Sequence, residues 1–297
     1  MGWGVAAASI LCLIASYITY SLIFSVRYHY LEFSVPAPLQ YNEINAESVE
    51  LSFLQMKAII CGITLVIGVG CFIGTVKLWQ YLVVGVLFGA SYYLAEWLIN
   101  ENEPLVNYVD PGGALIVHEF GAYWGMAVGF VLQEKRVFDA DTTFTTHSIG
   151  WVWLSATLLF LLWPSFVCVA YSGLECMKAM AVCFFGGVGS AITAFLTEFL
   201  VKSLKGKKID SVVFAYCCLG GLVGTSSSLF VVGKWGGFAI GCIAGICSVL
   251  SFNFIQKPIE KFFGFVDVMG VHNLHGICSW VSMISVVILL AADGYGK

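Results

Sequence analysis

The sequence predicts an all-α polytopic membrane protein, and three observations carry that prediction. Hydrophobic residues make up 59% of the 297 residues and charged residues only 11%. The mean hydropathy of +0.90 is typical of membrane proteins rather than soluble ones. Apolar runs of roughly 20 residues, long enough to cross a hydrocarbon core of ~30 Å, recur along the whole chain.

These runs predict about nine transmembrane helices. They cover approximately residues 3–26, 57–76, 79–99, 112–132, 149–171, 179–201, 211–232, 235–255 and 270–291. The first run lacks a basic leader and is longer than the apolar core of a typical signal peptide, so we expect it to be retained. The long connection 27–56 contains prolines and glutamates and is interpreted as an extramembrane acidic segment. No boundary interrupts the rest, which predicts a single membrane domain over 1–297.

The orientation follows from the basic residues, because cytoplasmic loops carry an excess of lysine and arginine. One side of the predicted bundle has nine such residues and the other has five. The nine are Lys77, Lys135, Arg136, Lys202, Lys205, Lys207, Lys208, Lys257 and Lys261, and the five are Arg27, Lys57, Lys178, Lys234 and Lys297. We therefore expect the first group, and with it the N-terminus, to face the cytoplasm.

A polar site is predicted inside the apolar run that follows Asp110. His118 lies eight residues after this acid, and glycines recur at every fourth position from Gly121 to Gly129. A histidine at membrane depth is costly unless it lines a cavity or has a partner, which makes it a functional candidate. A core histidine bonded to a carbonyl is the alternative interpretation. Asp110 itself is compatible with a simple helix N-cap.

A second stretch repeats this pattern far away in the sequence. Asp267 precedes His272 and His275 at the start of the last apolar run. The acid has the same two interpretations as Asp110, an N-cap or a support for the site. Two acid–histidine stretches predict a paired arrangement of polar groups from two helices.

Together these stretches resemble the Rhesus glycoprotein branch of the ammonium transporter family. One family motif is matched by Asp110, Gly112, Gly113, His118 and residues 120–123 (FGAY), another by residues 272–276 (HNLHG), and a third by residues 163–166 (WPSF). The resemblance implies an ammonium-transporter-like bundle whose pore is lined by His118 and His275, with His272 as the alternate second histidine. It also implies that Asp110 supports the site and that Phe166 gates one mouth. A lone phenylalanine is more often a core residue, and only the WPSF context favours the gating role for Phe166.

Departures from the family pattern are informative as well. The chain lacks apparent counterparts of the second, third and last family helices. Val69 aligns with the position of the second gating phenylalanine, and Glu119 stands beside His118 where the family has a small or neutral residue. A charge at mid-membrane costs about 2.5–3.5 kcal/mol on insertion scales, so we expect Glu119 to have a partner on a neighbouring helix. Glu198 is expected to snorkel or to pair with Lys202, four residues on.

Two functions are consistent with these features. The first is a reduced Rh-type channel that passes ammonia, ammonium or another small neutral gas or amine through a twin-histidine pore. The second is a non-transporting Rh-derived subunit with a structural or assembly role in a larger membrane complex. The eleven cysteines show no CxxC spacing, and no nucleophile–base pattern is present, so we expect neither an enzyme nor a cofactor or metal site.

Besides the lipid bilayer, the expected partners are further copies of the chain or other subunits of a membrane complex. No basic run indicates a nucleic-acid partner. The resemblance implies the plasma membrane as the location, with another membrane, such as an organellar inner membrane, as the alternative.

Overall fold

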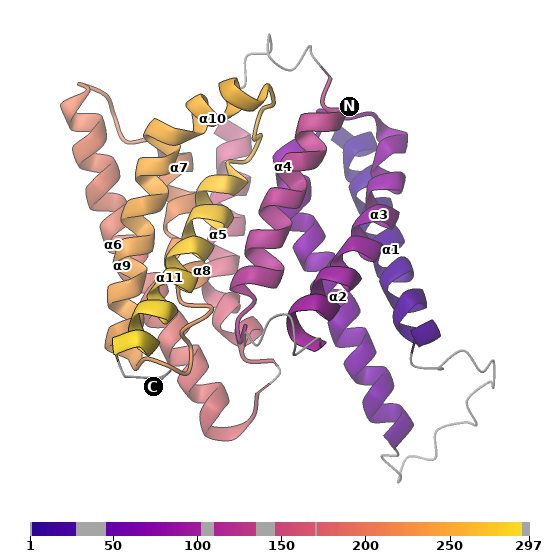
Figure 1. The fold of residues 1–297 in the computed structure, drawn as a ribbon. Coiled ribbons are helices and arrows are strands. Elements are labelled where there is room, and N and C mark those ends of the chain that lie inside the picture. The colour runs from indigo at the N-terminus through magenta and orange to yellow at the C-terminus, as the bar shows by residue number, and fades with distance from the viewer. Residues whose placement is uncertain (1, 28–45, 102–109, 135–145, 170, 293–297) are drawn as a thin grey trace.

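The computed structural model describes residues 2–27, 46–101, 110–134, 146–169 and 171–292. Within these ranges the chain is helical and contains no β-strand, and the helices form a bundle (Figure 1). The elements are α1 (Gly2–Arg27), α2 (Ala46–Phe72), α3 (Leu78–Glu96), η1 (Trp97–Glu101), η2 (Ala114–Glu119), α4 (Phe120–Leu132), α5 (Thr146–Val167), α6 (Gly173–Leu204), α7 (Ser211–Cys217), α8 (Gly220–Gly224), α9 (Lys234–Leu250), η4 (Ser251–Ile255), α10 (Gln256–Phe263), η5 (His272–Gly276) and α11 (Ile277–Ala292); the η elements are π-helical.

Eight of the described helical segments are long and apolar enough to cross a membrane. They are Trp3–Val26, Leu54–Phe72, Leu78–Ile99, Ala114–Leu132, Ser148–Val167, Gly173–Leu204, Lys234–Phe263 and His272–Ala292. An apolar helix satisfies all its backbone hydrogen bonds internally, which is what the hydrocarbon core of a bilayer requires. The chain is therefore an integral, multi-pass membrane protein.

The predicted span over 211–232 is not a continuous helix, which corrects the sequence interpretation. It crosses the bundle as α7, α8 and a series of turns (Figure 1). Here the backbones come too close for side chains, since a Cβ on Gly221 would lie 1.9 Å from the carbonyl oxygen of Gly186. The polar groups of the broken segment are satisfied inside the protein: Thr225 Oγ1 donates to the Gly221 carbonyl, and the Ser227 amide donates to Ser282 Oγ. Irregular backbone at membrane depth is tolerated only when it is buried in this way.

The connection between the first two spans is shorter than predicted. Helix α1 extends to Arg27 and α2 begins at Ala46, so residues 46–56 are helical rather than part of the connection. Hydropathy does not detect this extension because the residues that precede Leu54 are polar enough to lie outside the lipid and yet form a helix. The remainder of the predicted connection, 28–45, lies outside the described residues.

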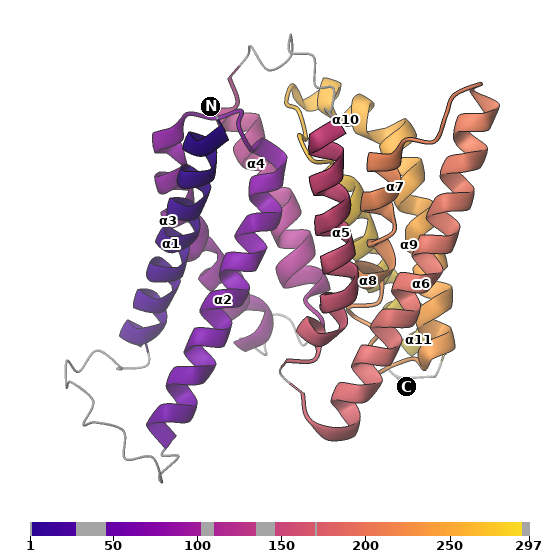
Figure 2. The same cartoon turned by 180° about the vertical axis from the view of Figure 1, so that it is seen from behind.

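We call α1–α4 and α6–α11 the two halves of the bundle; α1 and α3 run in the opposite direction to α6 and α9 (Figure 1). Helices α1 and α3 pack together as α6 and α9 do, with glycines of the later helix against carbonyls of the earlier one. A Cβ on Gly85 would lie 2.3 Å from the Cys12 oxygen, and one on Gly241 would lie 2.0 Å from the Gly186 oxygen. The buried side chains also form two main clusters, one centred on α1–α4 and one on α5–α11. Helix α5 lies between the halves and has no counterpart among the described helices (Figure 2).

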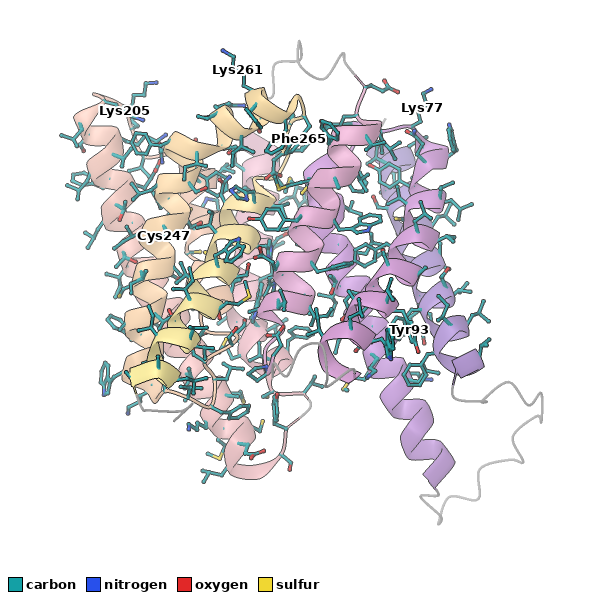
Figure 3. All side chains as sticks on the ribbon, in the orientation of Figure 1. Lys77, Tyr93, Lys205, Cys247, Lys261 and Phe265 are labelled. Atoms are coloured by element: carbon teal, nitrogen blue, oxygen red, sulfur yellow. The ribbon has the colours of Figure 1, made fainter. Side chains whose placement is uncertain are left out.

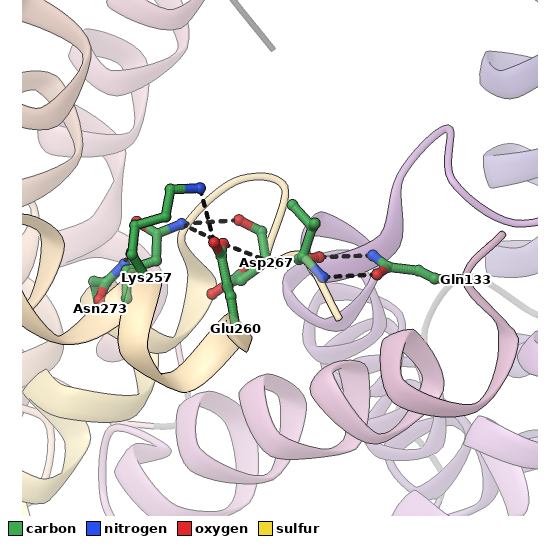
Figure 4. A network of polar contacts seen from close by, with 7 residues as sticks. Gln133, Lys257, Glu260, Asp267 and Asn273 are labelled. Atoms are coloured by element: carbon green, nitrogen blue, oxygen red, sulfur yellow. Dashed lines mark hydrogen bonds and ion pairs between the residues drawn. The ribbon is translucent and has the colours of Figure 1, made fainter. Parts of the chain in front are cut away.

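A glutamine connects the two halves directly. At the end of α4, Gln133 Nε2 donates to the carbonyl of Val266 at 2.6 Å, and the Val266 amide donates to Gln133 Oε1 at 2.8 Å (Figure 4). The same Nε2 lies 3.3 Å from the carbonyl oxygen of Cys71, at the end of α2. One amide side chain therefore joins the first half to the loop that precedes His275.

Candidate functional site

His118 and His275 meet at the boundary between the two halves. His118 lies in η2, which leads into α4, and His275 lies in η5, which leads into α11. Their Nδ1 atoms are 3.2 Å apart and their rings are stacked with centroids 5.2 Å apart. At this distance one Nδ1–H donates a hydrogen bond and the other Nδ1 accepts it, so two neutral rings with opposite tautomers satisfy the contact. The Nε2 atom of His118 is buried and has no hydrogen-bond partner among the described residues.

Both histidine helices begin at a carboxylate, which is half-buried in Asp110 and buried in Asp267. Asp110 accepts hydrogen bonds of 2.7–2.9 Å from the amides of Ala114, Leu115 and Ile116. Asp267 accepts bonds of 2.9 and 2.8 Å from the amides of Val271 and His272. These bonds satisfy the first amides of each helix, which otherwise lack partners. Both acids therefore serve as caps that orient the turns bearing the histidines.

Burial raises the pKa of both capping carboxyls. It raises the pKa of Asp267 to about 6, although the amides of His272 and Val271 favour the charged form and lower the value in part. Burial raises the pKa of Asp110 in the same way, again opposed by backbone amides. Both carboxyls lie outside the membrane-spanning segments, at the two points where the chain enters the histidine helices.

The histidine pair faces a cavity of about 700 Å³ that is otherwise mostly apolar. Trp163 and Phe166, both on α5, line this cavity. The Trp163 ring stacks on both imidazoles, with centroid distances of 5.3 Å to His118 and 6.2 Å to His275. Sequence reasoning did not assign Trp163 to the site, although it begins the WPSF motif that singled out Phe166. Trp163, Phe166 and the two imidazoles thus line one mostly apolar cavity.

The cavity opens sideways between α2 and α5. Of the side chains that line it, Val66 is 54% exposed, Trp151 58% and Leu162 62%. All three lie in helices that are long and apolar enough to span the membrane. The opening lies beside α5, the helix without a counterpart in the other half. At this depth, lipid or another protein must cover it.

Two predicted positions do not reach the cavity. His272 is absent from the lining of the cavity. Its ring centroid lies 5.7 Å from that of Tyr123, and its buried Nδ1 has no hydrogen-bond partner in the described part of the chain. Val69, aligned with the second gating position, is buried in the core cluster of the first half instead. The histidine that meets His118 is thus His275, and His272 is not interchangeable with it.

The two glutamates that the sequence analysis singled out, Glu119 and Glu198, are buried and have partners. Ser279 Oγ on α11 donates a hydrogen bond to the Glu119 carboxylate, which provides the partner on a neighbouring helix that the sequence required. Glu198 pairs with Lys202 at 3.4 Å and accepts a bond from Asn253 at 2.7 Å. Because its side chain is fully buried, Glu198 pairs and does not snorkel.

The fold and the site define a multi-pass helical membrane protein with a histidine pair buried where its two halves meet. The ammonium transporter family matches the chain over residues 4–296, and the chain belongs to this family. In the solved structure of Rh50 from Nitrosomonas europaea the likeness covers 97% of this chain and 72% of that one, with a TM-score of 0.81 and 24% identity.

Curated relatives agree with this assignment. The chain is 28% identical over 247 residues to Rhesus-like glycoprotein B of Dictyostelium discoideum, which covers 82% of this chain and 40% of the relative. It is 30% identical over 219 residues to the ammonium transporter Rh type A of Mus musculus, covering 72% of this chain and 49% of the relative. The chain therefore spans about half the length of these relatives, or less.

Proposed function

We propose that this chain is a reduced Rh-type channel that passes ammonia, or another small neutral gas or amine, along the His118–His275 pair. The observation that carries the proposal is the Nδ1–Nδ1 contact of 3.2 Å within an otherwise apolar cavity. Buried imidazoles without an ion partner are suited to a neutral molecule that both donates and accepts hydrogen bonds. Ammonia is such a molecule.

The apolar lining of the cavity favours neutral ammonia over the ammonium ion. Stripping the water from ammonium and placing the ion in a medium of low dielectric constant costs tens of kcal/mol by a Born estimate. Neutral ammonia does not pay that electrostatic cost. The unpartnered Nε2 of His118 is available to bond it inside the protein. Trp163 and Phe166 line the cavity beside the histidine pair, which is compatible with a gating role for Phe166.

The sideways opening favours the second candidate, a non-transporting subunit of a larger membrane complex. Polar groups that line a path cannot be satisfied by lipid, so conduction requires a cover that excludes lipid without filling the cavity. A partner that fills the cavity makes the chain structural. In both cases we infer an assembly, of further copies or of other subunits, that buries well over about 1,000 Å². The plasma membrane is the proposed location, with an organellar inner membrane as the alternative.

Reconstitution into liposomes tests the proposal. We expect an imposed ammonium gradient to change the internal pH faster in liposomes that contain the self-associated protein than in empty ones. His118→Ala and His275→Ala should alter this rate, whereas His272→Ala, a matched change outside the cavity, should not. Folded, self-associated protein that gives no more flux than empty liposomes refutes conduction and leaves the structural role. Flux that is insensitive to both cavity histidines refutes the proposed path.

A further inference from the structure

Five exposed lysines gather at one end of the bundle, and we call them the lysine rim. They are Lys205, Lys207 and Lys208 in the turn between α6 and α7, and Lys257 and Lys261 on α10. Figure 3 shows Lys205 and Lys261 along the same upper edge of the molecule. Within the described residues, Lys207, Lys208 and Lys261 form no ion pair. The positive charge of this edge is therefore available to a partner.

The two acids on these elements, Asp210 and Glu260, offset only part of the charge of the five lysines. The Asp210 carboxylate accepts hydrogen bonds from the Val212 and Val213 amides and so caps α7. Glu260 is buried and pairs with Lys257 at 2.8 Å. Of the five lysines, only Lys257 has its charge matched within the described structure. A net positive surface remains.

Large apolar side chains are exposed among the same lysines. Phe262 is 82% exposed, Leu204 88% and Phe254 51%. Lys205 Nζ lies 4.3 Å from the centroid of the Phe254 ring, which links the α6–α7 turn to the segment that leads into α10. Short helices that carry lysines beside exposed aromatic rings are typical of the membrane interface, where the rings enter the acyl region and the ammonium groups stay at headgroup level.

We propose that the lysine rim binds the headgroups of anionic phospholipids. The charge is complementary to a phosphodiester, and the rim lies at the ends of spanning helices, where headgroups are found. The adjoining phenylalanines favour a lipid over a free phosphate, since only a lipid supplies acyl chains for them. The lysine and arginine distribution assigns this end to the cytoplasmic side, whose leaflet carries anionic lipids.

Bound headgroups would stabilise the start of η5, the turn that bears His275. Below the rim, Glu260 Oε1 accepts bonds from Gln256 Nε2 at 3.0 Å and from the Asp267 amide at 3.1 Å (Figure 4). Asp267 in turn caps the turn that begins at His272. A lipid that holds α10 at the interface therefore also holds this network in place, so anionic lipid should raise the thermal stability of the protein.

The test measures lipid binding to the full-length protein in neutral detergent. Phosphatidylserine is titrated by native mass spectrometry, with phosphatidylcholine as the comparison and inorganic phosphate as the competitor. An interfacial lysine contributes about a fivefold gain in affinity. We expect Lys207→Gln/Lys208→Gln/Lys261→Gln to weaken phosphatidylserine binding on the order of 100-fold. Because these lysines form no ion pair, the triple variant should fold, which a melting curve without added lipid verifies.

A single pair of variants supplies the matched control. Lys205 and Lys234 both lie beside aromatic rings, and Lys234 begins α9 at the opposite end of the bundle. Lys205→Gln should weaken binding about fivefold, and Lys234→Gln should not change it. Equal binding of the two lipids, an unchanged triple variant, or an equal loss in Lys234→Gln overturns the proposal. Displacement of phosphatidylserine by millimolar inorganic phosphate also overturns it, because the site would then be one for a free anion.

Discussion

The contact between Gln133 and Val266 should be a main determinant of how firmly the two halves are joined. In Gln133→Ala, the amide and the carbonyl of Val266 both lose the only partner that the structure gives them. An unsatisfied buried backbone group costs about 1–3 kcal/mol. Since Val266 is half-buried and water relieves part of this loss, we expect the unfolding free energy to fall by about 2–3 kcal/mol in total.

Gln80→Ala is the control for this prediction. Gln80 Oε1 also accepts a hydrogen bond of 2.8 Å from a backbone amide, but at an exposed helix start, where water replaces the bond. Unfolding free energies of both variants are measured by titration with a denaturing detergent. Gln133→Glu, which accepts from the Val266 amide but cannot donate to its carbonyl, should be destabilised as well. A loss in Gln133→Ala within about 0.5 kcal/mol of that in Gln80→Ala refutes the reasoning.

Three further predictions concern packing, protonation and a buried acid. Gly241→Ala should fail to give a folded bundle on size-exclusion chromatography, because its Cβ would lie 2.0 Å from an α6 carbonyl oxygen; Gly62→Ala, with nothing within 4 Å, should fold normally. The pKa of Asp267 in the folded protein, about 6, exceeds the usual value of 3.8, so its contribution to stability is present at low pH and is lost as the pH rises from about 4 to about 6. Asp267→Asn should therefore remove a pH dependence of up to about 3 kcal/mol from the unfolding free energy. Identical pH profiles of the variant and the unaltered protein would contradict this. Ser279→Ala should destabilise the protein by about 1–3 kcal/mol in thermal melts, because it removes the hydroxyl that donates a hydrogen bond to Glu119. Adding Glu119→Gln to Ser279→Ala should cause no further loss of stability.

The sequence alone determined the membrane class, most of the spans and the two histidine stretches. These features are local, because a run of about 20 apolar residues crosses a bilayer whatever its neighbours are. The caps are local too: Asp110 and Asp267 each lie eight residues before a histidine and bond amides of the turns that follow. A pairing of His118 with a histidine of the last run followed from the family resemblance.

Helix geometry by itself does not say which histidine of the last run meets His118, because residues three apart on a regular α-helix point only about 60° from one another. The family resemblance favoured His275, with His272 as the alternate. The wider π-helical turn of η5 separates them, and His275 alone reaches the cavity. The partner of Glu119 was equally undetermined, because Ser279 lies 160 residues away in sequence.

The broken crossing at 211–232 and the sideways opening beside α5 also depend on tertiary contacts. Hydropathy registers the apolar character of residues 211–232 but not the approach of Gly221 to the Gly186 carbonyl, which is a property of two helices together. Likewise, the sequence shows which helices are present, and only their packing shows that α2 and α5 leave the cavity open between them. Local sequence sets the elements, whereas close contacts between distant elements set the site.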